Sequence, residues 1–428
     1  MKAAYLEEQL NHPDREARLQ ALRELVALEP RPEPDAQPSV QGWVNNHIHT
    51  CYSFSPYSPC AAVYYARKAG LETAGIMDHD SVGGCAEFVQ AGAIAGLPVT
   101  AGFELRVNMD ATPLRGKRFN SPDQRSIAYV AAHGIPQSKL ADCEAFLAPL
   151  RKLRNARNRR MVEKLNGLLA GLCPALDFDR DILPLSRHQD GGSVTERHIL
   201  CGLSKAIMEK TGKGKGTAAF LQGKLKIPLS EKVEAYLRDA ENPHYLYDLI
   251  GALKSGLLSR FYIDAAGECP DVREFIRFAG EIGAIAAYAY LGDVINSATG
   301  DKKAQSFEDG YLEELFTFLE QAGFHAVTYM PSRNTMEQLR RVMALCEAHE
   351  LFQISGEDIN TSRQSFICPA LAQPAFRHLN AATWALIGHE AVVGRRTGDG
   401  MFSEETLHTC PSLAQRISMF EMAGKNHH

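Results

Sequence analysis

The sequence lacks several features that would assign it to a specialised class of protein. It has no run of about 18 apolar residues, the length that a membrane-spanning helix needs, so we expect no association with a membrane. It has no large excess of either charge, because 46 lysines and arginines face 51 aspartates and glutamates. We therefore do not expect nucleic acid as a partner. The polar first eleven residues lack the apolar core of a signal peptide.

Cysteine pairs of the Cys-x-x-Cys kind are also missing. Ten cysteines are scattered through the 428 residues. This spacing indicates reduced thiols that pack as small core residues, and it predicts a cytoplasmic protein. Nothing in the neighbourhoods of these cysteines favours a thiol nucleophile over that packing role.

The sequence does contain the alternation that is typical of an α/β fold. From residue 43 onward, short apolar runs alternate with longer helical segments. The expected strands are residues 43–48, 73–77, 97–104, 126–132, 284–290, 324–330 and 351–356. The expected helices between them are residues 60–69, 85–95, 308–322 and 335–350. In parallel β/α folds the carboxyl ends of the strands share one face, where active sites form.

The chain is long enough for one large domain with an insertion, or for two domains. Leucines at near-helical spacing predict one N-terminal helix over residues 2–29, and four prolines then predict a linker over residues 29–38. We expect five regions: an N-terminal helical extension with its linker (1–42), a first β/α part (43–140), a helical insertion (141–260), a second β/α part (261–400) and a C-terminal tail (401–428).

The insertion has its own character. Its strand pattern disappears, so we expect a helical cap over the strand ends. Basic residues crowd one helix-length window of it, namely Arg151, Lys152, Arg154, Arg157, Arg159, Arg160 and Lys164. For most of them we expect a solvated helix face. A glycine- and lysine-rich loop at residues 211–217 lacks the spacing and the ending of a Walker A loop.

Ionisable residues gather at the ends of the expected strands. His47 and His49 are two positions apart on one strand, so both imidazoles project to the same side and can grip one metal ion. Further groups end other strands, namely Asp78, His79, Asp80, Glu104 and Asp358. Imidazoles with carboxylates form the ligand set of zinc, manganese or iron rather than of calcium. The alternative is a set of loop caps and salt bridges, but adjacent ionisable groups are costly without a cation that organises them.

These segments resemble the PHP family, the polymerase and histidinol phosphatase domain of the amidohydrolase-like superfamily. The most specific part lies in residues 47–56, 69–70, 77–84 and 102–104, and a positional match continues in residues 195–200, 284–292 and 356–360. The resemblance covers about residues 43–362. It implies a distorted seven-stranded β/α barrel, similar to a TIM barrel, with a helical cap insertion; the N-terminal helical extension lies outside it. It also implies divalent metals at the strand ends and hydrolysis of phosphate esters.

By this resemblance a first metal site would consist of His47, His49, Glu104 and Asp358, and all four are present. The family's other two metal sites are substituted. The second needs two histidines where this chain has Tyr129 and Tyr290, and a neutral tyrosine is a poor ligand. The third keeps His79 but has Ser55 and Asn360 at its other positions. We therefore expect one divalent ion (Mn, Zn or Fe) per chain, and two at most.

The resemblance also implies roles for other residues. The expected catalytic residues are His198 as phosphate contact or proton donor, Tyr129 and Tyr290 as hydrogen-bond donors, and Asp78 as a partner of the ligands. The expected substrate-binding residues are Arg197, Arg333 and Asn360. The structural alternatives are a hydrogen-bonded helix histidine for His198, strand-end packing for the tyrosines and an ordinary surface position for Arg333.

Three functions fit this pattern. The first is a metal-dependent phosphoesterase that hydrolyses a small phosphorylated metabolite or nucleotide with a metal-activated water. The second is a hydrolase or lyase for a non-phosphorylated substrate on the same barrel, favoured by the substituted second site. The third is a non-catalytic binding protein, which four retained ligands argue against. We expect the first, with a small anionic molecule as partner.

Overall fold

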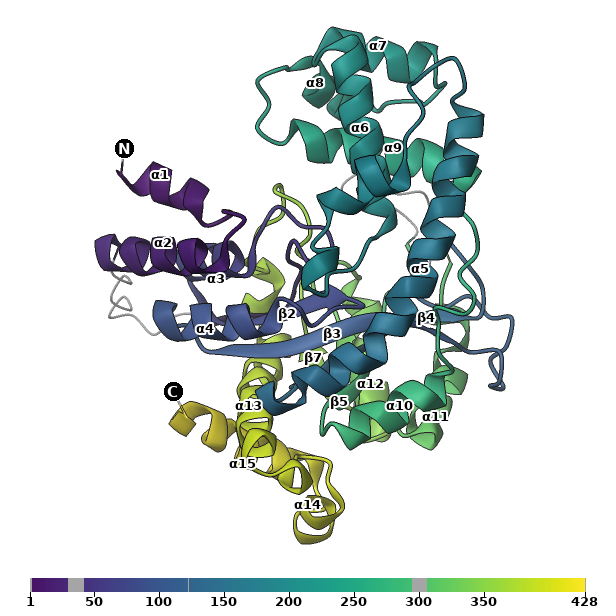
Figure 1. The fold of residues 1–428 in the computed structure, drawn as a ribbon. Coiled ribbons are helices and arrows are strands. Elements are labelled where there is room, and N and C mark those ends of the chain that lie inside the picture. The colour runs from purple at the N-terminus through teal and green to yellow at the C-terminus, as the bar shows by residue number, and fades with distance from the viewer. Residues whose placement is uncertain (1, 30–41, 122, 295–305, 428) are drawn as a thin grey trace.

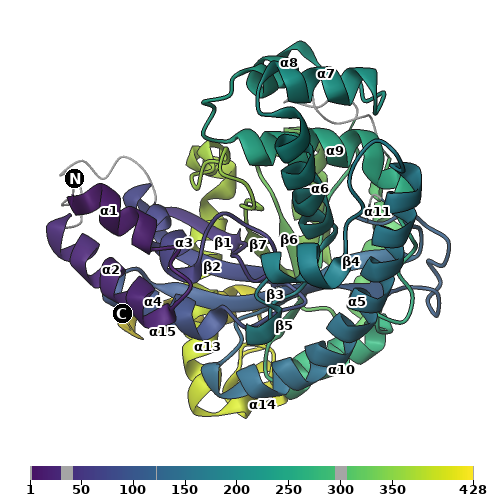
Figure 2. The same cartoon turned by 45° about the horizontal axis from the view of Figure 1, so that its top comes forward.

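Seven strands form a single sheet that curls into a nearly closed barrel in the computed structural model of the chain (Figure 1 and Figure 2). The structure describes residues 2–29, 42–121, 123–294 and 306–427. The strands, in their order around the sheet, are β1 (Trp43–Ile48), β2 (Leu71–His79), β3 (Val99–Asn108), β4 (Ile127–His133), β5 (Ile285–Ala289), β6 (Ala326–Tyr329) and β7 (Phe352–Ser355). The seven expected strands are all present, and the α/β barrel prediction is confirmed.

The direction of β4 distorts the barrel. β1 pairs with β2, β2 with β3, β5 with β6 and β6 with β7 in parallel, whereas β4 runs antiparallel to both of its neighbours, β3 and β5. The ring is closed beyond the end of β7: the N–H of His49 donates to the carbonyl of Ile359 (3.0 Å), and the N–H of Ile359 donates to the carbonyl of His47 (3.1 Å). The barrel seam therefore lies at the two histidines.

Helices surround the barrel, as Figure 2 shows. They include α3 (Pro59–Lys68), α4 (Cys85–Ala95), α10 (Val272–Glu281), α11 (Leu312–Ala322), α12 (Met336–Ala348) and α13 (Arg377–Arg395). The C-terminal helices α14 (Glu404–Thr409) and α15 (Leu413–His427) follow, and α15 crosses α13 at a pair of glycines. A Cβ on Gly388 would lie 1.9 Å from the carbonyl oxygen of Phe420, so only glycine permits this close crossing. No helix among the described residues is long and apolar enough to cross a bilayer.

The N-terminal region differs from the single helix expected over residues 2–29. It forms two helices, α1 (Lys2–Gln9) and α2 (Arg15–Leu28), because Pro13 interrupts the leucine pattern and Asp14 caps the second helix by accepting the N–H of Ala17 at 2.8 Å. In α2 the buried Arg18 pairs with Glu87 of α4 and so fixes the extension to the barrel. Most of the expected proline linker, residues 30–38, lies outside the described residues.

Most of the segment between β4 and β5 rises above the barrel in Figure 1, whereas the start of α5 (Leu140–Leu168) and α10 lie against the barrel. The second half of α5 shares an apolar core, separate from that of the barrel, with α6 (Glu196–Thr211), α7 (Lys215–Gly223), α8 (Glu231–Arg238) and α9 (Tyr245–Phe261). We call this segment, residues 140–261, the cap. The solvated face expected for its basic window holds for Lys152, Arg159, Arg160 and Lys164. The other three arginines of that window are buried against carboxylates: Arg151, Arg154 and Arg157.

Candidate metal centre and its cavity

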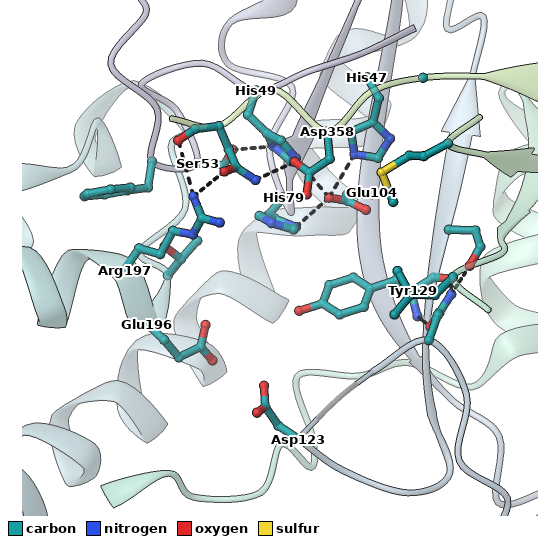
Figure 3. A pocket seen from close by; sticks show the side chains of 18 of the residues that line it. His47, His49, Ser53, His79, Glu104, Asp123, Tyr129, Glu196, Arg197 and Asp358 are labelled. Carbon is teal, nitrogen blue, oxygen red and sulfur yellow. Dashed lines mark hydrogen bonds and ion pairs between the residues drawn. The ribbon is translucent and has the colours of Figure 1, made fainter. Parts of the chain in front are cut away.

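Two imidazoles and two carboxylates meet at the barrel seam. The Nε2 atoms of His47 and His49 each lie 3.3 Å from Oε1 of Glu104. Oδ1 of Asp358, just beyond β7, lies 3.0 Å from the same Nε2 of His49. His47 and His49 share a side because they are two residues apart in extended backbone. The four residues expected as the first metal site are thus brought together (Figure 3).

His79 joins this cluster from the end of β2. Its register places it directly beside Glu104 on β3, and its Nδ1 lies 2.9 Å from Oε1 of Glu104. Its ring centre lies 4.6 Å from that of His49. Glu104 is therefore surrounded by three imidazoles on one side of the barrel.

The donor atoms of the cluster are arranged to bind a metal ion rather than to form hydrogen bonds with one another. His49 Nε2 and His79 Nδ1 are buried and lie near carboxylate oxygens, yet neither has hydrogen-bond geometry with any described residue. One donor atom each from His47, His49 and Glu104 lies within 4.8 Å of the others. Buried polar atoms without partners are costly, and imidazole and carboxylate donors around one point match a divalent zinc, manganese or iron ion. The residues present therefore fit a metal.

The charges of the cluster depend on one another. Although burial favours the neutral ring, Asp358 and Glu104 raise the pKa of His49 to about 10. Burial would raise the pKa of Glu104, but His79 and His47 hold it well below its usual range. Burial lowers the pKa of His79. Burial would also raise the pKa of Asp358, but His49 holds it below its usual range. Both carboxylates are consequently charged at neutral pH, as metal ligands must be.

Asp78 lies behind the cluster and does not line the cavity. Its buried carboxylate accepts the N–H of Thr50 (2.7 Å) and the hydroxyls of Thr50 (2.6 Å) and Ser53 (2.5 Å). The Ser53 oxygen in turn lies 3.1 Å from Nδ1 of His49. This chain fixes the orientation of the His49 ring, which is how outer partners commonly hold a ligand histidine.

The two tyrosines in place of the family's histidines differ in their positions. Tyr129 lines the cavity, with its ring centre 5.6 Å from that of His79. It reaches this end because β4 runs antiparallel, which presents the beginning of β4 to the ends of the parallel strands. Tyr290 also lines the cavity, but its hydroxyl donates to Asp309 at 2.6 Å. Burial raises the pKa of both phenols, so both stay protonated.

His198 lies behind the cavity wall. It is buried at the start of α6, and its ring meets the cavity-lining ring of Phe54 edge-on at 4.9 Å. Its Nδ1 accepts the N–H of Thr195 at 2.9 Å, which leaves the proton of the neutral ring on Nε2. Burial lowers the pKa of His198 to about 3. The ring is therefore neutral near pH 7.

The three residues expected to bind substrate all line the cavity. Arg197 donates to the side-chain oxygen of Asn360 (2.6 Å), and Asn360 donates to Oδ1 of Asp358 (2.5 Å). Arg333 donates through Nε to the carbonyl of Leu291 at 3.0 Å. The cavity itself measures about 310 Å³, which is enough for a small metabolite.

Sequence reasoning missed the contribution of the cap and of one loop to this cavity. Lys254 from α9, Glu196 from α6 and Asp123 from the loop before β4 all line it. Figure 3 shows Asp123 and Glu196 in the part of the cavity away from the imidazoles. Lys254 is exposed to solvent and lies near Arg197. Of these three residues, only Glu196 could have been found from the sequence, because it precedes Arg197 in residues 195–200, which resemble the PHP family.

The comparisons with known proteins concern the fold. The sequence matches no family model and no curated protein. A solved structure from Bifidobacterium adolescentis, provisionally described as a metal-dependent phosphoesterase, is similar with a TM-score of 0.52 and 21% identity, over 81% of this chain and 98% of that one. An amidohydrolase from Chromobacterium violaceum, with bound sulfate and no metal, has a TM-score of 0.49 and 17% identity, over 79% and 96%. The first likeness supports the barrel fold alone.

Proposed function

We propose that the protein is a metal-dependent hydrolase of the phosphoesterase type, acting on a small phosphorylated metabolite or nucleotide. One observation carries the proposal: the cluster of imidazoles and carboxylates opens onto a cavity lined by the cations Arg197, Lys254 and Arg333. An anionic substrate fits walls of this charge. The phosphoesterase description of the Bifidobacterium protein agrees with it.

His47, His49, Glu104 and Asp358 would hold the metal, with His79 beside them, and we propose one manganese, zinc or iron ion per chain. Such an ion supplies Lewis acidity, which lowers the pKa of water and offsets the negative charge that develops during hydrolysis. A protonated phenol replaces an imidazole at residue 129, so the chain offers few ligands for a second ion.

The other residues would bind and orient the substrate. Arg197 and Asn360 stand beside Asp358, where they can donate to an anionic group near the metal. We propose that Tyr129 donates its hydroxyl hydrogen to the substrate, whereas the hydroxyl of Tyr290 is engaged by Asp309. Asp78 orients His49 through Ser53. His198 would reach the substrate past Phe54 as a phosphate contact that donates from its Nε2–H, because a neutral ring with its proton on Nε2 does not release that proton near pH 7.

A second candidate is hydrolysis or lysis of a non-phosphorylated substrate at the same centre. Asp123 and Glu196 favour it, since carboxylates on the cavity wall repel a dianionic phosphate and attract hydroxyl or amine groups. We also propose a cytoplasmic location, supported by ten cysteines that are all free.

The test is hydrolysis by the protein after reconstitution with manganese, zinc or iron, using phosphomonoesters, phosphodiesters, and carboxylic amides and esters. We expect turnover of a phosphate ester that disappears in Glu104→Gln, which keeps the side-chain shape but removes the ligand charge. Turnover of carboxylic substrates alone would select the second candidate. Full phosphatase activity in Glu104→Gln would refute the assigned centre.

A further inference from the structure

Three arginines and three carboxylates meet where the cap joins the barrel, and we call this group the seam cluster. Its members are Asp80, Arg106, Arg154, Arg157, Glu196 and Glu268. Arg157 of α5 pairs with Glu196 at 2.6 Å and with Glu268 at 2.9 Å. Arg106 of β3 pairs with Glu268 at 2.7 Å. Breaking a buried ion pair leaves an uncompensated charge, so this cluster favours one position of the cap.

Arg154 connects the seam cluster to the metal centre. One of its terminal nitrogens donates to the carboxylate of Asp80, and the other donates to Glu196 at 3.0 Å. Asp80 directly follows His79 and has a left-handed backbone (φ 49°). Its N–H donates to the carbonyl of Glu104 at 2.8 Å. Arg154 of the cap therefore holds the residue that links two members of the imidazole–carboxylate cluster.

Arg197 makes a second connection, to the segment beyond β7. It donates to the side-chain oxygen of Asn360 at 2.6 Å and to its carbonyl at 3.2 Å. Asn360 donates to Oδ1 of Asp358, the atom that lies 3.0 Å from Nε2 of His49. The dashed lines in Figure 3 trace this path from the cap to the cluster.

Both connections begin at one point of the cap. Glu196 and Arg197 are consecutive residues in the first turn of α6, so a displacement of this helix end moves both paths together. One path ends at His79, the last residue of β2, and the other at Asp358, which lies just beyond β7. An ion that holds His79 and Asp358 in place therefore also holds the start of α6, and contacts that hold the start of α6 also position these two ligands. Thermodynamic coupling of this kind acts equally in both directions.

We propose that Arg154 and Arg197 are positioning residues through which the cap sets the metal affinity of the centre, and through which bound metal holds the cap on the barrel. The inference rests on the metal centre of the proposed function and does not depend on which reaction the centre catalyses. Partners behind the ligands of metal sites commonly change metal affinity 10- to 100-fold.

The test compares three matched variants: Arg154→Lys, Arg197→Lys and the control Arg18→Lys. Lysine keeps the charge but cannot bridge two acceptors as the arginine fork does. Arg18 is also a buried, forked arginine, but its partners Glu87, His12 and Pro13 lie on neither path to the metal centre. We expect zinc and manganese affinity, measured by competition with a chromophoric chelator, to fall about tenfold in the first two variants and at most about twofold in the control. Metal should slow amide exchange in α6 of the wild type, and less so in Arg154→Lys.

Unchanged affinity in both test variants would overturn the coupling and leave the metal centre intact. An equal loss in Arg18→Lys would also overturn it, since the loss of metal affinity would then follow from lowered stability of the fold and not from the two paths. If circular dichroism shows that Arg154→Lys does not fold, Arg197→Lys decides alone, because Arg197 is only partly buried and lies outside the seam cluster. A wild type that binds neither ion would refute the metal centre itself.

Discussion

Nε2 of His49 lies 3.0 Å from Oδ1 of Asp358, and this contact joins the first strand of the barrel to the segment that follows the last one. Next to it, the N–H of His49 donates to the carbonyl of Ile359. The candidate metal centre and the closure of the barrel are therefore the same place. A metal bound there would tie the two ends of the sheet together.

We accordingly predict that metal stabilises the folded chain. Binding to the folded state alone adds about 2.7 kcal/mol at a free metal concentration of 100 times Kd. The melting temperature, followed by calorimetry, should rise on adding the ion and fall on adding a chelator. Glu104→Gln should show neither shift. If the melting temperature of the wild type did not change on adding metal, no ion would join β1 to the segment after β7.

The ligands should differ in importance. His49 is fully buried and its Nε2 contacts two carboxylates, whereas Nδ1 of the more exposed His79 contacts one. We expect His49→Ala to lower metal affinity more than about 100-fold and His79→Ala about tenfold, as measured by chelator competition. A larger loss of affinity in His79→Ala than in His49→Ala would place the ion nearer to His79 than to His49.

Lys254 should act on substrate binding. It reaches the cavity from the cap, near Arg197. If it contacts the substrate equally in the ground and transition states, Lys254→Met raises KM about tenfold and leaves kcat unchanged. Lys224→Met, on the exposed surface of the cap, is the matched control. A loss confined to kcat would instead assign Lys254 to the chemical step.

Stability should depend on pH through Glu390 of α13. Its carboxylate accepts the hydroxyl of Thr100 (2.7 Å) and the N–H of Ala101 (2.8 Å), and burial raises its pKa to about 7 from an ordinary value of 4.5. Between these values the folded chain holds a proton that the unfolded chain has released. Stability from this group therefore falls as pH rises from about 4.5 to 7 and is constant above that range.

Glu390→Gln removes this titration and keeps an acceptor for both hydrogen bonds. Urea unfolding at pH 5 and pH 8 should show the variant gaining stability relative to the wild type at the higher pH. Glu8→Gln, at an exposed position, is the control, and its difference in stability from the wild type should be the same at pH 5 and pH 8. A constant difference between Glu390→Gln and the wild type would contradict the raised pKa.

The strands were predictable from the sequence because each is a short apolar run that ends in polar residues. The break between α1 and α2 was missed because leucines at near-helical spacing resume after it, although Pro13 interrupts the pattern and Asp14 caps the new helix. The direction of β4 was not predictable at all. Tyr129 was expected at a strand end, and it reaches the cavity because β4 is reversed.

The ligand cluster could be inferred because its members lie at or near the ends of expected strands. Glu104 was expected to end its strand, whereas β3 continues to Asn108, but the parallel register still places Glu104 beside His79. The composition of the cavity wall could not be inferred from the sequence. Lys254 and Asp123 reach it through the placement of the cap and a loop, which depends on tertiary packing. The burial of Arg154 likewise depends on carboxylates 42 and 74 residues away in the chain, Glu196 and Asp80.

The central claim is a single metal ion held by His47, His49, Glu104 and Asp358. The measurement that tests it most directly is the metal content per chain, by elemental mass spectrometry, after reconstitution with manganese, zinc or iron and removal of free ions. We predict one ion per chain in the wild type and none in Glu104→Gln. Two or three ions per wild-type chain, or an ion retained by Glu104→Gln, would contradict the account.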